Sequence, residues 1–154
     1  MTLPKTALMT LLALALFLPV SAIAQERGTP EEAQAMVADA IAFTREVGVE
    51  AAFAEMNSGE SRFRDRDLYV FVVAADGAVV AQVADPGRVG MDARSLRDAA
   101  DTAYGAMIVD HATPDGVWVE YLREDPITGD ITPKASWVVR YDGYVFGCGV
   151  YLTQ

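Results

Sequence analysis

Lysine, histidine and cysteine are nearly missing from this sequence. Its 154 residues include one cysteine and one histidine, and its only lysines are Lys5 and Lys134. A lone cysteine excludes an internal disulfide, so we expect Cys148 to be a small buried apolar residue in a fold held by packing. A lone histidine, His111, argues against a histidine-based catalytic triad or zinc site. We therefore expect no metal.

Positive charge is scarce as well. Lysine and arginine together number 12 against 22 aspartates and glutamates, which gives a formal net charge of −10. Such a surface repels nucleic acid and anionic lipid. Phosphate-loop, dinucleotide-binding and Gly-x-Ser-x-Gly motifs are also missing, so we expect no cofactor and no enzymatic activity. An enzyme that uses carboxylates is the least favoured class.

Long apolar runs are limited to the start of the chain. Lys5 precedes an apolar run over residues 7–20, and the small residues Ser21 to Ala24 follow. This is the pattern of a secretory signal peptide cleaved after Ala24. The run is short for a membrane span of about 20 residues, which makes an uncleaved anchor the weaker alternative. The residue directly after Ala24 is Gln25 rather than a cysteine, so a lipid anchor is disfavoured. We predict a periplasmic or secreted product without membrane insertion.

The predicted product, residues 25–154, has enough chain for one domain with its own core. Without Lys5 it carries 11 basic and 22 acidic residues, a net charge of −11. The segment Thr29-Pro30-Glu31-Glu32 is typical of a helix start, because Thr29 and Glu32 have capping-box spacing and Pro30 suits the first turn. Helical periodicity continues to Val47, Gly48 ends it, and a short helix follows over residues 49–56.

Five later segments are rich in β-branched and aromatic residues and are predicted strands. They are Leu68–Val73, Ala78–Val83, Val117–Leu122, Lys134–Tyr141 and Tyr144–Leu152. Asp76-Gly77 is typical of a tight turn between the first two, and a further helix is expected within residues 96–112. The order predicts an α+β fold with a five-stranded antiparallel sheet and a long N-terminal helix.

An ordered series of short motifs accompanies these elements. It comprises Gly116-Val117-Trp118-Val119-Glu120-Tyr121, Pro133-Lys134, Ser136-Trp137, Asp142-Gly143 and Gly149-Val150-Tyr151. With the helices and the Asp76-Gly77 hairpin, the series resembles the single Cache domain, an extracellular small-molecule sensor of bacterial chemoreceptors and sensor kinases. The resemblance covers residues 30–152. It implies a PAS-like sheet, with the long helix on one face and a ligand pocket on the other.

The resemblance also implies a ligand, since ligands of this family include short carboxylates. A carboxylate that leaves water requires a cation and hydrogen bonds. Lys134 can supply the charge, while Tyr121, Trp137, Tyr69 and Trp118 can supply donors and an apolar wall. These five residues are the predicted ligand-binding set. In a regular strand Lys134 and Trp137 point to opposite faces, so they share a site only at a strand end or bulge.

Each of these residues also has a structural interpretation. Lys134 can be a solvated charge at a strand end, and the tyrosines and tryptophans can be core residues. The favoured hypothesis remains an exported, non-catalytic Cache domain that binds a small carboxylate or similar metabolite. It would act in ligand sensing, signal transduction or chemotaxis, with a membrane receptor or sensor kinase as its partner. The alternative is a secreted interaction protein that docks on a membrane receptor without a ligand of its own.

Overall fold

Helix α1 (Pro30–Val47) begins at the predicted capping box. The Thr29 hydroxyl accepts a hydrogen bond from the Glu32 backbone N–H at 3.2 Å, and the Glu32 carboxylate accepts one from the Thr29 N–H at 2.8 Å. Gly48, with a φ of 85°, separates α1 from α2 (Val49–Met56). The computed structural model describes residues 26–152. The predicted signal peptide therefore lies outside the described residues.

The sheet is antiparallel, and its final strand lies inside it. Strands pair in the order β2 (Leu68–Ala74), β6 (Tyr144–Tyr151), β5 (Ile131–Tyr141) and β4 (Val117–Glu124). The other edge of β2 pairs with β3 (Val79–Gln82) and with the two-residue β1 (Arg64–Asp65). Two 3₁₀ turns, η1 (Pro86–Arg88) and η2 (Ala93–Ser95), and helix α3 (Tyr104–His111) connect β3 to β4.

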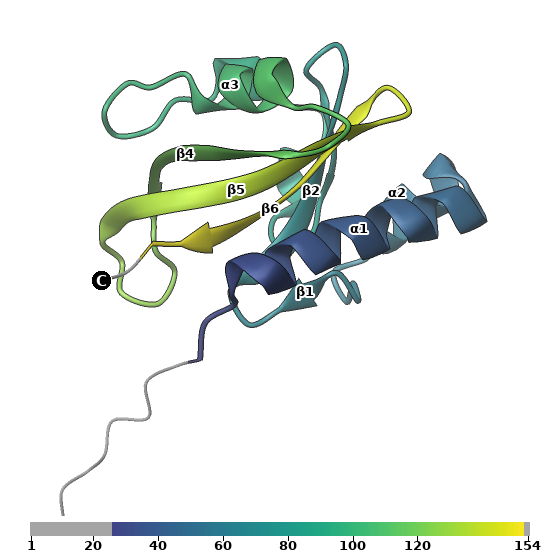
Figure 1. Cartoon of the computed structure of the whole chain (residues 1–154), viewed down its shortest axis with the longest axis horizontal. Coiled ribbons are helices and arrows are strands. Elements are labelled where there is room, and N and C mark those ends of the chain that lie inside the picture. The colour runs from purple at the N-terminus through teal and green to yellow at the C-terminus, as the bar shows by residue number, and fades with distance from the viewer. Residues whose placement is uncertain (1–25, 153–154) are drawn as a thin grey trace, which may run out of the picture.

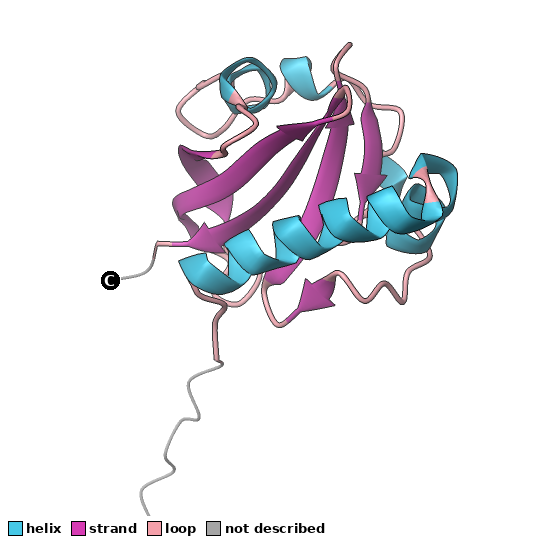
Figure 2. Cartoon of the chain, turned by 45° about the vertical axis from the view of Figure 1, so that its right-hand side comes forward, coloured by secondary structure: helices cyan, strands magenta, loops and turns pink. Residues whose placement is uncertain are grey.

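Two apolar layers lie on opposite faces of this sheet. Alternate residues of the strands point to opposite faces, and α1 packs on the face formed by residues such as Val72, Phe146 and Cys148. The other face, which includes Val119 and Val138, is covered by η2 and α3. Figure 1 and Figure 2 show α1 crossing one side of the sheet and α3 lying away from it, beside β4. The predicted α+β class is thus confirmed.

The predicted helices and all five predicted strands are present, and the bounds of the strands differ by one to three residues. The polar stretch before β2 contributes the short strand β1, and β5 begins at Ile131 rather than at Lys134. Pro133 therefore lies within a strand, opposite Leu122. Pairing of β6 with β5 stops at Lys134, and only the Pro133 carbonyl is used beyond it, by the Leu152 N–H at 2.8 Å. A residue without an N–H is tolerated there.

Candidate functional site

A cavity of about 50 Å³ lies between the sheet and the cover formed by η1, η2 and α3. Its walls are mainly aromatic and aliphatic, with few polar groups, which is the usual character of a small-molecule site. The lining residues are Tyr69, Phe71, Val73, Val79, Gln82, Arg88, Met91, Ala93, Leu96, Tyr104, Gly105, Ile108, Tyr121 and Arg123.

Two glycines bring the walls of this cavity close together. A Cβ on Gly147 of β6 would lie 2.2 Å from Cζ of Phe71, so the Phe71 ring lies flat across the strand. A Cβ on Gly105 of α3 would lie 1.7 Å from the Ala93 carbonyl oxygen, so α3 packs directly on η2. Both contacts require the absence of a side chain. The glycines therefore set how near the cover approaches the sheet.

Arg123 of β4 supplies positive charge to the cavity wall. Its side chain is half-buried and donates a hydrogen bond to the Tyr104 hydroxyl at 3.2 Å. Within residues 26–152, no carboxylate pairs with Arg123 as an ion pair. Burial alone lowers the pKa of Arg123, but the neighbouring phenol groups outweigh it and raise that pKa. The guanidinium is thus a fixed cation with bonding capacity left over.

Two buried oxygen atoms on the cavity face of the sheet have no hydrogen-bond partner among the described residues. One is Oε1 of Gln82, whose side chain lines the cavity from β3. The other is the hydroxyl of Thr132, which lies opposite Arg123 in the β4–β5 ladder. A buried polar atom without a hydrogen-bond partner destabilises the folded protein. The cavity face of the sheet therefore holds unused acceptors, besides the donor capacity of Arg123.

Lys134 lies beneath this wall rather than in it. Lys134 is only 1% exposed, so it is not a solvated charge at a strand end. Nζ donates a hydrogen bond to the Tyr69 hydroxyl at 3.2 Å and lies 4.5 and 4.4 Å from the ring centres of Tyr69 and Tyr151. Gly149 leaves room for the stem, because a Cβ there would lie 2.5 Å from Lys134 Cε. Lys134 does not line the cavity itself, and its amine is linked to it by the hydrogen bond to Tyr69.

Tyr121 joins the floor of the cavity to the interior of the sheet. Its ring stacks on Tyr104 at 4.4 Å, and its hydroxyl lies 2.8 Å from the Ser136 hydroxyl. Burial raises the pKa of Tyr121 far above its ordinary value, so the phenol stays neutral. Lys134, Tyr121 and Tyr69, three of the five predicted residues, therefore lie together on one face of the sheet.

The two tryptophans of the predicted set lie on the opposite face. Strand β5 is regular at this point, so Trp137 points away from Lys134. Trp118 of β4 pairs directly with Trp137. Their rings are 5.4 Å apart and pack against the core beneath α1. Both are half-buried. Neither tryptophan lines the cavity, so the five residues do not form a single site.

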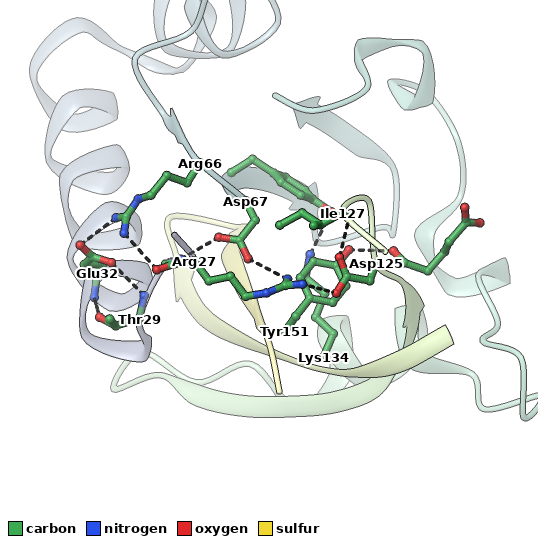
Figure 3. A network of polar contacts seen from close by, with 12 residues as sticks. Arg27, Thr29, Glu32, Arg66, Asp67, Asp125, Ile127, Lys134 and Tyr151 are labelled. Atoms are coloured by element: carbon green, nitrogen blue, oxygen red, sulfur yellow. Dashed lines mark hydrogen bonds and ion pairs between the residues drawn. The ribbon is translucent and has the colours of Figure 1, made fainter. Parts of the chain in front are cut away.

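A buried ion-pair cluster lies beyond Tyr151, at the end of the sheet where α1 begins (Figure 3). Arg27 donates to the Asp125 carboxylate at 2.6 Å and approaches Asp67 at 3.5 Å, and both carboxylates are buried. Burial acts to raise the pKa of Asp125, but the Ile127 N–H and Arg27 outweigh it, so that pKa is lowered. The cluster fixes the segment before α1 onto the β4–β5 connection.

The sequence did not single out Arg123 or Gln82 as ligand-side residues. Arg123 follows Tyr121 by two positions in a predicted strand, so it shares the face of Tyr121. The sequence therefore indicates on which face of the sheet Arg123 lies, but its lack of an acidic partner depends on long-range packing. For Gln82 the sequence predicts only a position in a half-exposed strand. A search for cations with the parity of Tyr121 would have found Arg123.

No protein-family model matches this chain, and no curated protein matches it significantly. Solved structures do match it. A methyl-accepting chemotaxis protein from Vibrio parahaemolyticus RIMD 2210633 superposes with a TM-score of 0.65 and 20% identity, over 79% of this chain and 87% of the other. The periplasmic sensor domain of a chemotaxis protein matches with a TM-score of 0.59 and 24% identity, over 80% and 90%.

A Cache chemosensory domain, described in terms of carboxylic acid recognition, matches with a TM-score of 0.64 and 19% identity, over 80% of this chain and 92% of the other. The predicted single Cache fold is therefore confirmed as a fold. Among residues 26–152, no helix combines the length and apolar content needed to cross a membrane.

Proposed function

We propose that the protein is an exported sensor domain that binds a small carboxylate in the cavity between its sheet and α3. The observation that carries the proposal is Arg123, a half-buried cation on the cavity wall without a carboxylate partner among the described residues. A carboxylate suits such a group, because a guanidinium binds both carboxylate oxygens at once. The fold supports a sensor rather than an enzyme, since the similar solved structures come from chemotaxis proteins.

Lys134 has a supporting role in this proposal. Its amine donates to the Tyr69 hydroxyl oxygen, which leaves the Tyr69 hydrogen free to donate toward the cavity that Tyr69 lines. A phenol that accepts a charge-assisted bond becomes a stronger donor, because hydrogen bonds in a chain polarise one another. Lys134 is then a positioning residue that acts on the ligand through Tyr69.

Ligand occupancy would pass to a partner, for which a membrane receptor or sensor kinase is the proposed class. The predicted leader supports export, since it directs residues 25–154 to the periplasm or medium. A secreted interaction protein without its own ligand is the competing function. Binding of a small molecule in the cavity distinguishes the two.

The test is a thermal-shift screen of short carboxylates, amino acids and amines, followed by calorimetric titration of the best ligand. Arg123→Gln should weaken binding of a carboxylate about ten- to a hundredfold, as expected for loss of a charge-assisted hydrogen bond. Arg94→Gln is the matched control, because Arg94 pairs with Asp110 at 2.8 Å and does not line the cavity. If no carboxylate binds, or if Arg123→Gln binds as tightly as wild type, the proposed function is wrong.

A further inference from the structure

A polar groove adjoins the cavity on the outer side of two arginines. The groove has a volume of about 420 Å³, against about 50 Å³ for the cavity. Arg88 and Arg123 line both spaces, so the two spaces meet at these side chains. A ligand that fills the cavity and is longer than it can therefore extend past both arginines into the groove.

Three arginines from separate parts of the chain line this groove. Arg88 comes from η1, Arg97 follows η2, and Arg123 comes from β4. The chain as a whole has a formal net charge of −10. A ligand anion approaching the protein would otherwise meet repulsion, so a local group of guanidiniums defines where it can bind. The groove consequently offers three guanidiniums to a second negative charge, beside the carboxylates of Asp98 and Glu124 that also line it.

The carboxylates that now pair with these arginines are replaceable. Arg88 lies 3.3 Å from Asp85, and Arg97 lies 3.7 Å from Asp101, but the side chains of these aspartates are 61% and 87% exposed. Ion pairs with such exposed partners contribute little to stability and are screened by water and salt. A ligand carboxylate held between two or three guanidiniums can displace them.

Asp98, one of the acidic residues of the groove, is already hydrogen-bonded to the backbone. Its carboxylate accepts hydrogen bonds from the N–H groups of Leu122 at 3.0 Å, Thr102 at 2.8 Å and Ala100 at 2.9 Å. These bonds tie the loop that carries Arg97 to strand β4. They also lower the pKa of Asp98, the Leu122 N–H most of all, so this carboxylate stays ionised with its oxygens engaged by the backbone. The loop backbone that carries Arg97 is thus held beside the groove before any ligand arrives.

We propose that the groove binds a second acidic group of the ligand, so that the preferred ligand is a small dicarboxylate. The proposal rests on the proposed function, in which one carboxylate binds Arg123 at the cavity wall. The second carboxylate lies in the groove with Arg97 and Arg88. A monocarboxylate of equal length uses only the first of these positions.

The test is calorimetric titration with matched acids of four to six carbons, such as butanoate against butanedioate. Wild type should bind the best diacid about tenfold tighter than its monoacid, as expected for one added charge-assisted contact. Arg97→Gln should remove this preference and leave the monoacid affinity unchanged. Arg94→Gln, outside the groove, should change neither affinity. Arg97 is 54% exposed in its side chain, so the variant should fold, which thermal unfolding checks.

Each other result identifies what fails. Equal affinity for mono- and diacids across the series, or a diacid preference that survives Arg97→Gln, overturns the groove proposal and leaves the carboxylate site intact. If neither kind of acid binds, the proposed function fails and the groove proposal fails with it. A diacid preference abolished by both Arg97→Gln and the Arg94→Gln control would reflect overall charge alone and would also overturn the groove proposal.

Discussion

The ammonium group of Lys134 brings positive charge under the cavity wall without facing the cavity itself. It is covered by the rings of Tyr69 and Tyr151, and Tyr69 is its only hydrogen-bond acceptor among the described residues. A cation held by aromatic rings and one phenol is less well compensated than one held by a carboxylate. The charge is therefore available to influence an anion on the far side of Tyr69.

Lys134→Met tests this role, because methionine keeps an unbranched apolar stem and removes the charge. We expect ligand affinity to fall about three- to tenfold, consistent with the loss of one hydrogen bond. If Lys134 acts through Tyr69, then Tyr69→Phe should cause a similar loss, and the double variant should lose little more than either single variant. Calorimetric titration measures all three, and thermal unfolding controls for folding.

Two outcomes would contradict this interpretation. Affinity unchanged in Lys134→Met would make Lys134 a core residue only. Fully additive losses would mean that Lys134 and Tyr69 act separately on the ligand. Lys134→Arg should not restore wild-type affinity, because the guanidinium is wider than the ammonium group. The Lys134 stem already fills the space above Gly149, where an added Cβ would lie 2.5 Å from Lys134 Cε.

The Arg27–Asp125 pair predicts a pH dependence of stability. The pKa of Asp125 lies below its ordinary value of 3.8 in the folded state. Its stabilising effect is therefore complete above the unfolded pKa and is lost as pH falls through the folded pKa. Asp125→Asn should reduce the free energy of unfolding by about 1–3 kcal/mol near neutral pH. The difference from wild type should shrink as pH drops below about 4.

Chemical denaturation at several pH values measures this effect. Asp130→Asn is the matched control, because Asp130 lies in the same connection and is exposed. It should leave both the stability and its pH dependence nearly unchanged. A constant difference between wild type and Asp125→Asn down to pH values of about 2 would contradict the assignment.

Among the elements, β6 has two glycines whose neighbours leave no room for a side chain. Gly147 and Gly149 lie on the ligand side of the sheet and leave space for Phe71 and Lys134 to cross the strand. Gly147→Ala should lower the free energy of unfolding by about 1–3 kcal/mol, because overpacking forces the Phe71 ring to move. The displaced ring enters the cavity, so ligand affinity should fall as well.

Denaturation and titration of one protein sample check both parts of the Gly147 prediction. Gly87→Ala in η1 is the control, since its nearest neighbour is Oδ1 of the exposed Asp85 at 3.1 Å and that side chain can move. A Gly147→Ala variant with wild-type stability and affinity would show that the Phe71 contact relaxes at no cost.

Local signals in the sequence were sufficient for most elements. Thr29 to Glu32 predicts the start of α1, because a capping box involves only residues close in sequence. The predicted start of β5 was wrong because of Pro133, which sequence patterns exclude from a strand. The strand tolerates this proline because its pairing with β6, far along the chain, stops at Lys134. The site was less predictable for the same reason. Parity placed Trp137 and Lys134 on opposite faces, but only tertiary packing determines which face holds the cavity.

At the scale of the whole molecule, the acidic surface and the predicted leader lead to one prediction about processing. Expression of the full sequence in a bacterial host should yield a periplasmic product that begins at Gln25, with or without cyclisation of that residue. Replacement of the small residues of the predicted cleavage site, as in Ala22→Leu with Ala24→Leu, should cause uncleaved chain to accumulate. Intact-mass measurement of the periplasmic and membrane fractions distinguishes these products. Full-length wild-type chain in the membrane fraction would contradict the prediction.

The position of β6 has a consequence for the order in which the chain can fold. β6 is the last strand of the described chain, yet it lies between β2 and β5 and is the strand against which α1 packs most. A chain emerging from a translocation channel with its N-terminus first would hold α1, β2 and the β4–β5 hairpin without the strand that joins them. Contacts between segments far apart in sequence form late, because the loop between them must first close. The sheet would thus be completed only when the final segment of the chain is released.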